Sequence, residues 1–147
     1  MGVPVLILGE SGSGKSASLR NFEPEEIGVF NVAGKPLPFR KKLQSVNTAD
    51  YEYIKRIIHK SDKKAFVIDD SQYLMCFESF ARAKDTGFGK FTDFALHFYN
   101  LALNRLVLVF LCNIEAIFFW VVHNGLECHS PVYISCSLKR ELHVIIV

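Results

Sequence analysis

The sequence predicts an α/β protein with a mainly parallel β-sheet and helices on the faces of that sheet. Apolar runs suited to buried strands alternate along the chain with segments of helical periodicity. The first apolar run, Val3–Gly9, leads into a glycine-rich loop, and a later one, Ala65–Asp70, ends in two carboxylates. Parallel strands end at a common edge of the sheet, where ligands bind, so we expect the loop and the carboxylates to lie at that edge.

The first half of the chain supplies two strands and two helices. We expect strands at Val3–Gly9 and Gly28–Ala33, and helices at Lys15–Phe22 and Thr48–Lys60. Both strands are short apolar runs of the kind found in buried parallel sheets. The second helix carries an apolar stripe of isoleucines, and Thr48 has the side chain of a helix N-cap. The segment between residues 34 and 47 is expected to be a polar loop.

The second half begins with the same alternation and then loses it. Strands are expected at Ala65–Asp70 and Leu106–Cys112, helices at Ser71–Lys84 and Lys90–Asn104, and late strands at Val132–Ser137 and Leu142–Val147. The Leu106–Cys112 run is continuously apolar, as a central parallel strand would be.

Composition divides the chain into a core, residues 1–115, and an atypical apolar tail, residues 116–147. Most charged residues and all but one glycine precede residue 101. Three interpretations of the apolar stretch Leu106–Val122 stay open: buried strands, a membrane helix at the short limit of length with Glu115 inside it, or the start of a truncated or out-of-frame terminus. The length fits one small domain, and the net charge of +2 excludes no partner.

Residues 9–16 read Gly-Glu-Ser-Gly-Ser-Gly-Lys-Ser, which is a complete G-x-x-x-x-G-K-[ST] phosphate-binding loop. Its glycines permit positive φ angles and a close approach of backbone N–H groups to anionic oxygens. We expect Lys15 to reach the β- and γ-phosphates of a nucleotide and the Ser16 hydroxyl to ligate Mg²⁺. The helix that begins near Lys15 would add its positive dipole end. The nucleotide-binding residues are therefore predicted to be Gly9, Glu10, Ser11, Gly12, Ser13, Gly14, Lys15, Ser16 and Ala17.

A nucleotide site that uses magnesium needs a second, acidic element, and Ala65–Asp70 has the pattern of a Walker B strand. We expect Asp69 to hold the metal with Ser16, and Asp70 to orient or deprotonate the attacking water. The alternative is that an aspartate at the strand end caps the helix that follows.

Two loops combine basic and aromatic residues, which suits single-stranded nucleic acid because cations bind phosphates and rings stack on bases. The first is Gly34–Lys42, with its basic residues from Lys35 to Lys42, and the second is Lys84–Phe91. The alternative is an ordinary solvated loop whose phenylalanines pack into the core.

Together the phosphate loop, the FVIDD strand, the Lys84–Phe91 loop and the LVLVFLCNIE stretch resemble small phage-encoded ATP-binding proteins of the AAA/RecA-like type, over residues 1–115. The resemblance implies a P-loop NTPase fold of the RecA-like (ASCE) class, a three-layer sandwich that is incomplete or atypical after residue 115. It implies ATP and Mg²⁺ as ligands, ATP hydrolysis, and a function in DNA recombination or replication. It also implies that Asn113, at the end of the fourth expected strand, senses the γ-phosphate. The family often places a catalytic glutamate near the end of strand two, which here ends Asn-Val-Ala-Gly without one.

Alternative functions remain beside the ATPase. A small-molecule kinase of nucleoside or nucleotide type shares the phosphate loop, and a remnant that binds ATP without hydrolysing it shares both motifs. No GTPase N-K-x-D motif and no transporter L-S-G-G-Q motif is present. A homo-oligomer that supplies an arginine finger is also compatible with the sequence. The four cysteines form no C-x-x-C pair, and no secretory leader is visible, so we expect a cytoplasmic protein without membrane partners, in the bacterial host if phage-encoded.

Overall fold

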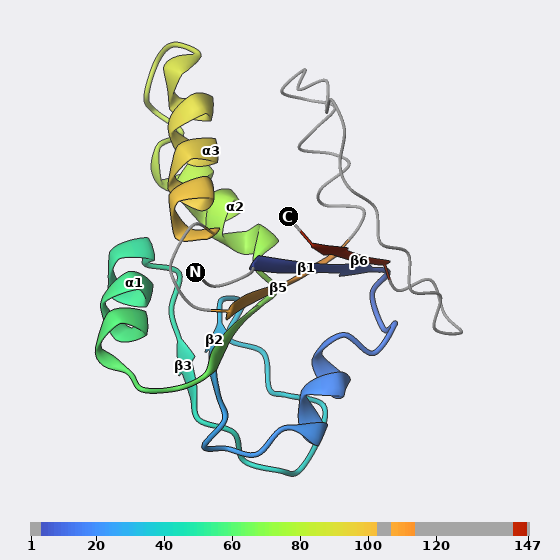
Figure 1. Cartoon of the computed structure of the whole chain (residues 1–147). Helices are drawn as coiled ribbons and strands as arrows, with labels where there is room; N and C mark the ends of the chain where they lie inside the picture. The colour runs from blue at the N-terminus through green and yellow to red at the C-terminus, as the bar shows by residue number, and fades with distance from the viewer. Residues whose placement is uncertain (1–3, 103–106, 114–142, 147) are drawn as a thin grey trace.

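The computed structural model describes residues 4–102, 107–113 and 143–146. Its centre is a six-stranded sheet with the strand order β3-β2-β4-β5-β1-β6. The strands are β1 (Pro4–Gly9), β2 (Ile27–Asn31), β3 (Ser45–Asn47), β4 (Ala65–Asp69), β5 (Val107–Asn113) and β6 (His143–Ile146). All neighbouring strands are parallel except β1 and β6. The expected α/β class with a mainly parallel sheet is therefore confirmed (Figure 1).

Four helical segments connect the strands. They are the 3₁₀ helix η1 (Ser16–Asn21) and the α-helices α1 (Tyr51–Lys60), α2 (Gln72–Ala81) and α3 (Gly89–Ala102). The helix expected at Thr48–Lys60 begins later, because Asp50 rather than Thr48 is its N-cap. The Asp50 carboxylate accepts hydrogen bonds from the backbone N–H groups of Glu52 at 2.9 Å and Tyr53 at 3.1 Å. A carboxylate binds these N–H groups and also suits the positive end of the helix dipole.

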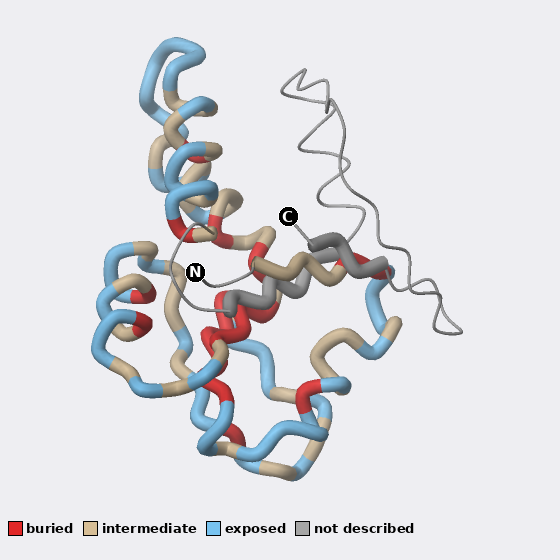
Figure 2. The backbone as a smooth tube through the Cα atoms, in the orientation of Figure 1, coloured by how far each residue is buried: buried red, intermediate tan, exposed pale blue. Residues whose placement is uncertain are grey.

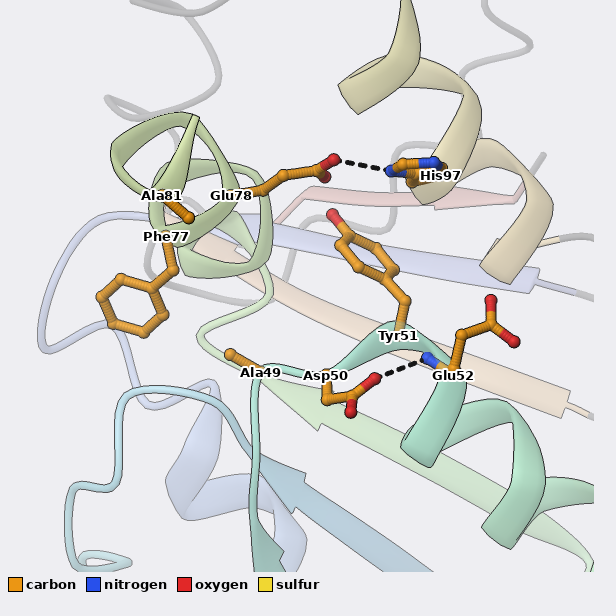
Figure 3. Close-up of a pocket in the computed structure, with 8 residues that line it drawn as sticks. All are labelled: Ala49, Asp50, Tyr51, Glu52, Phe77, Glu78, Ala81 and His97. Atoms are coloured by element: carbon orange, nitrogen blue, oxygen red, sulfur yellow. Dashed lines mark hydrogen bonds and ion pairs between the residues drawn. The ribbon is translucent and has the colours of Figure 1, made fainter. Parts of the chain in front are cut away.

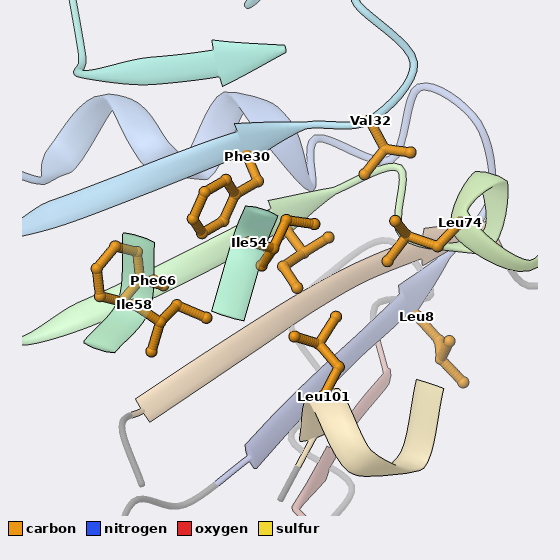
Figure 4. Close-up of a cluster of buried hydrophobic side chains, with 9 residues drawn as sticks. Leu8, Phe30, Val32, Ile54, Ile58, Phe66, Leu74 and Leu101 are labelled. Carbon is orange, nitrogen blue, oxygen red and sulfur yellow. The ribbon is translucent and has the colours of Figure 1, made fainter. Parts of the chain in front are cut away.

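Alternating side chains of the strands point to opposite faces of the sheet, and each face has its own apolar cluster. On one face, Phe30, Phe66 and Ile68 pack with residues of α1, α2 and α3 (Figure 4). On the other face, Val29 and Val67 pack with residues of η1 and of the loop between β2 and β3. Among the residues described, α-helices thus cover one face, and the expected helical layer on the other is replaced by a short 3₁₀ helix and a loop.

Of the last three strands expected along the chain, two are present. The strand expected at Leu106–Cys112 is present as β5, and the one expected at Leu142–Val147 is present as β6. The strand expected at Val132–Ser137 lies outside the described residues, as does most of the tail 116–147. No helix in the described ranges is long and apolar enough to cross a membrane.

A substitution of Gly28 in β2 tests how closely β2 packs against Phe66 of the neighbouring strand β4. A Cβ at this position would lie 2.7 Å from Cε1 of Phe66, a buried ring stacked on Phe30. Gly28→Ala is expected to lower the free energy of unfolding by about 1–3 kcal/mol, because the core must shift to admit the methyl group. The measurement is chemical unfolding followed by circular dichroism.

Gly89→Ala is the matched control, since an alanine Cβ there meets nothing within 4 Å and Gly89 starts α3. It is expected to leave stability unchanged or to raise it by up to about 1 kcal/mol. Equal unfolding curves for the two variants would contradict the packing described for β2 and β4.

Candidate functional site

The glycine-rich segment forms the turn that leaves the carboxyl end of β1. Gly12 has a φ of 79° and Gly14 a φ of 95°, so both occupy the left-handed region that favours glycine. The Ser13 N–H donates to the Glu10 carbonyl at 3.2 Å, which closes the turn. Gly9 does not share this conformation. It is the last residue of β1, pairs with Asn113 of β5, and has no positive φ.

The segment after the loop departs from expectation. In place of a helix over Lys15–Phe22, the chain forms the six-residue 3₁₀ helix η1, whose Leu19 is buried under the sheet. The Ser18 N–H donates to the carbonyls of Gly14 at 3.0 Å and Lys15 at 3.3 Å, so the first turn is closed. A segment this short has a small dipole. Positive potential at the loop therefore comes mainly from its N–H groups and from Lys15.

Lys15 lies back across the loop. Its Nζ donates to the Gly9 and Glu10 carbonyl oxygens, each at 2.7 Å, and is 3.4 Å from Ser13 Oγ. The ammonium group is thus held above the turn by backbone carbonyls. A phosphate oxygen could replace these neutral acceptors with a stronger, charged one.

The loop and the acidic strand are joined directly. Ser16 Oγ donates to Asp69 Oδ1 at 2.8 Å, across 53 positions of sequence. Asp69 ends β4 and is only 7% exposed. Burial raises the pKa of its carboxyl group above the usual 3.8, while the hydrogen bond from Ser16 acts against that rise. The structure therefore brings together the two residues that the sequence proposes as metal ligands.

Asp70 has a different environment from its neighbour. Its backbone is left-handed, with a φ of 55°, which aspartate tolerates better than most residues. Its Oδ2 forms an ion pair with Lys35 Nζ at 2.9 Å, and Gln72 Nε2 lies 3.4 Å from its Oδ1. The hydrogen bond to Asp70 raises the pKa of Lys35. The carboxylate expected to activate water is thus paired with a lysine from the loop after β2.

Asn113, expected to sense the γ-phosphate, is the last residue of β5. Because β5 lies between β1 and β4, its end is between the loop and Asp69 at the carboxyl edge of the sheet. The structure describes the backbone here and not the side chain, so the role of Asn113 stays a prediction.

Sequence reasoning missed two polar residues near Asp69. Lys35 was expected only as a nucleic-acid contact, and its pairing with Asp70 has no local signal. Asn31 ends β2 opposite Asp69 in the sheet register and is only 5% exposed. A signal for Asn31 existed, since a polar residue ends this apolar run as Asp69 ends the next one.

Two cavities in the described part of the chain are lined by residues outside the phosphate loop. One, of about 540 Å³, lies between the start of α1 and the helices α2 and α3 and includes Tyr51, Glu78 and His97 (Figure 3). The other, of about 520 Å³, lies beside the ends of β2 and β3 under the loop that contains Lys35. In the part of the chain that the structure describes, no group of three or more His, Cys, Asp or Glu side chains could hold a metal ion.

Comparison with known proteins adds no relative. No protein-family model matches the chain, and no curated protein has significant sequence similarity to it. The fold and the site therefore define the class alone: an α/β protein with a mainly parallel sheet, a glycine loop after the first strand, and a buried carboxylate bonded to the residue that follows the loop's lysine.

Proposed function

We propose that the protein is a magnesium-dependent ATPase with a P-loop NTPase fold of the RecA-like type. The observation that carries this proposal is the 2.8 Å hydrogen bond between Ser16 Oγ and Asp69 Oδ1. In this type of site a hydroxyl at the end of the phosphate loop and a strand-end aspartate serve the same ion. Two motifs distant in sequence thus meet with the side chains that the chemistry requires.

The donor set at this point fits Mg²⁺. The ion prefers oxygen ligands, keeps several waters, and is usually bound through one or two protein groups plus substrate phosphates. Ser16 and Asp69 would hold it. Asp69 is a buried carboxylate whose desolvation is only partly offset, so a cation there would stabilise its charged form. The bound ion would neutralise charge on the β- and γ-phosphates.

The chain's own residues would bind the triphosphate through the loop. N–H groups of the turn around Gly12 and Gly14 would face phosphate oxygens, and Lys15 would exchange its carbonyl partners for the β- and γ-phosphates. Glu10, Ser11 and Ala17 would contribute through their backbone, and Ser13 would do so once its N–H exchanges the Glu10 carbonyl for a phosphate oxygen. Water would attack the γ-phosphorus in line, while Lys15 and the loop amides stabilise the charge that moves to the leaving oxygen.

Activation of the attacking water falls to Asp70 or Asn113 in this proposal. One oxygen of the Asp70 carboxylate is occupied by the ion pair with Lys35, so the other, Oδ1, would orient the water. An arginine from a second copy of the chain would complete the charge stabilisation. The proposed role in phage DNA recombination or replication, in the cytoplasm of the bacterial host, rests on the sequence resemblance.

Product analysis with γ-labelled ATP tests the proposal. Release of free phosphate that requires Mg²⁺ is the expected result. Label on a small acceptor would instead favour the kinase alternative, and tight ATP binding without release would favour the non-hydrolysing remnant.

Single-stranded DNA is the partner we propose, and the two basic loops differ in how well they suit it. Phe39 of the Gly34–Lys42 loop packs against the apolar cluster on the sheet, so its ring is not free for stacking. Phe88 is 88% exposed at the far end of the α2–α3 hairpin, where most residues are exposed (Figure 2). It has Lys84 and Lys90 as near neighbours in sequence. The Lys84–Phe91 segment therefore supports the proposal, although its last residues form the first turn of α3.

Phe88→Ala is expected to weaken binding of a fluorescent oligo(dT) by about 5- to 150-fold, because stacking of one base on an aromatic ring contributes about 1–3 kcal/mol. Phe22→Ala serves as the control, since Phe22 is 43% exposed at the end of η1, at the opposite end of the molecule from the hairpin. Fluorescence anisotropy at fixed salt gives both affinities. Equal affinities for the two variants would remove the hairpin from the proposed DNA site.

A further inference from the structure

The cavity of about 520 Å³ beside β2 and β3 has a mainly basic wall and a polar floor. The wall is the loop after β2, including Lys35, Arg40 and Lys42, and the floor includes Asn31 and Asn47 at the strand ends. Leu37, Phe39 and Leu43 of the same loop pack against the sheet, so the loop is anchored on both sides of its cations. The volume of the cavity, about 520 Å³, is within the range of small-ligand sites.

The polar floor of the cavity is tied to its wall within the protein. The Asn31 Nδ2 group donates to the Lys35 carbonyl, which fixes the orientation of the amide. The floor and the wall therefore hold each other in place at this corner of the cavity.

The charges of the wall are only partly used within the protein. Lys35 is paired with Asp70 at 2.9 Å and Lys41 with Glu23 at 3.0 Å. Arg40 and Lys42 have no ion pair or hydrogen bond with any residue that the structure describes. Two unpaired cations match the charge of a phosphate monoester, which is close to −2 at neutral pH, better than the single charge of a phosphodiester.

We infer that this cavity binds a small phosphate monoester, with the phosphate on Arg40 and Lys42. The site is separate from the phosphate loop, and it does not depend on the proposed ATPase function. Lys35 connects the two regions, because it lines the cavity and binds Asp70 beside Asp69.

Isothermal titration calorimetry with uridine 5′-monophosphate tests this inference, because the probe is a small phosphate monoester and uridine is the same molecule without the phosphate. We expect saturable binding to the full chain, and at least about tenfold weaker binding of uridine. The double variant Arg40→Gln/Lys42→Gln is expected to weaken binding of the nucleotide by at least about tenfold. Both side chains are exposed, and the thermal melt of the variant checks that it folds.

Two control variants test whether the probe binds in this cavity and not elsewhere on the protein. Lys60→Gln/Lys64→Gln removes the same charge from exposed positions outside the cavity and should bind within about twofold of the unmodified chain. Lys15→Ala should also bind the probe normally, whether or not the ATP proposal holds, because Lys15 does not line the cavity.

Four results would overturn the inference. They are absence of binding to the folded chain up to about 10 mM probe, equal weakening in the two double variants, loss of binding in Lys15→Ala, and displacement of the probe by a tighter oligo(dT) without terminal phosphates. The last result would assign the cavity to a nucleic-acid strand.

Discussion

Lys15→Ala is expected to weaken ATP binding by about 10- to 150-fold and to abolish turnover. The ammonium group is the one side-chain cation of the loop, and a charge-assisted hydrogen bond contributes about 1.5–3 kcal/mol. Its neutral partners in the ligand-free protein, the carbonyls of Gly9 and Glu10, are exchanged for charged phosphate oxygens when the nucleotide binds. Calorimetry gives the affinity, and phosphate release gives the turnover.

Lys60→Ala is the control for this experiment, because Lys60 is an exposed lysine at the end of α1. It should leave both quantities unchanged. Without nucleotide, Lys15→Ala should change the free energy of unfolding by no more than about 1–2 kcal/mol, since two partly exposed hydrogen bonds are lost. Retention of ATP turnover by a folded Lys15→Ala protein would refute the proposed role of the loop.

Asp69→Asn is expected to have two effects of opposite sign. Without ligand, the folded state raises the pKa of Asp69, so it favours the protonated carboxyl group. The native carboxyl group therefore lowers stability progressively as the pH rises above its usual pKa of 3.8. Asparagine is neutral at every pH and can still accept the hydrogen bond from Ser16. The ligand-free variant should thus melt higher than the native protein at pH 7, and this difference should shrink toward pH 3.

In the presence of ATP, the same change should remove most of the magnesium dependence. Asp70→Asn is the matched variant, because asparagine tolerates the left-handed backbone at this position. It loses the ion pair with Lys35 while Ser16 and Asp69 stay in place, so its magnesium titration should stay closer to that of the native protein. A larger magnesium defect in Asp70→Asn than in Asp69→Asn would show that the roles of the two carboxylates are reversed.

The elements that the sequence predicts well are those whose pattern is local. The apolar runs at β1, β4 and β5 and the stripe of α1 each contain the information that determines them. The same is true of the loop glycines, because a positive φ is a property of Gly12 and Gly14 themselves. Motifs with fixed spacing likewise single out Ser16 and Asp69, which the structure joins by a hydrogen bond.

What the sequence did not predict depends on contacts between distant segments. The strand β3 has three residues and pairs only along the edge of β2, so its pattern is too short to detect. The Lys35–Asp70 ion pair requires the fold of the loop after β2. The N-cap at Asp50 is different, because its hydrogen bonds to the N–H groups of Glu52 and Tyr53 are local. Threonine and aspartate both favour the N-cap position, so propensity alone does not choose between Thr48 and Asp50.

The central claim is that the loop and Asp69 form one site for a magnesium–triphosphate complex. Its most direct test is the melting temperature of the full chain as a function of ATP concentration, with Mg²⁺ and with a chelator. With Mg²⁺ and ATP at about 100 times the dissociation constant, the account predicts about 2.7 kcal/mol of added stability, or a rise of roughly 5–10 °C, and a much smaller rise with the chelator. A melting temperature that does not change with ATP at millimolar concentrations, or that rises equally with and without Mg²⁺, would contradict this claim.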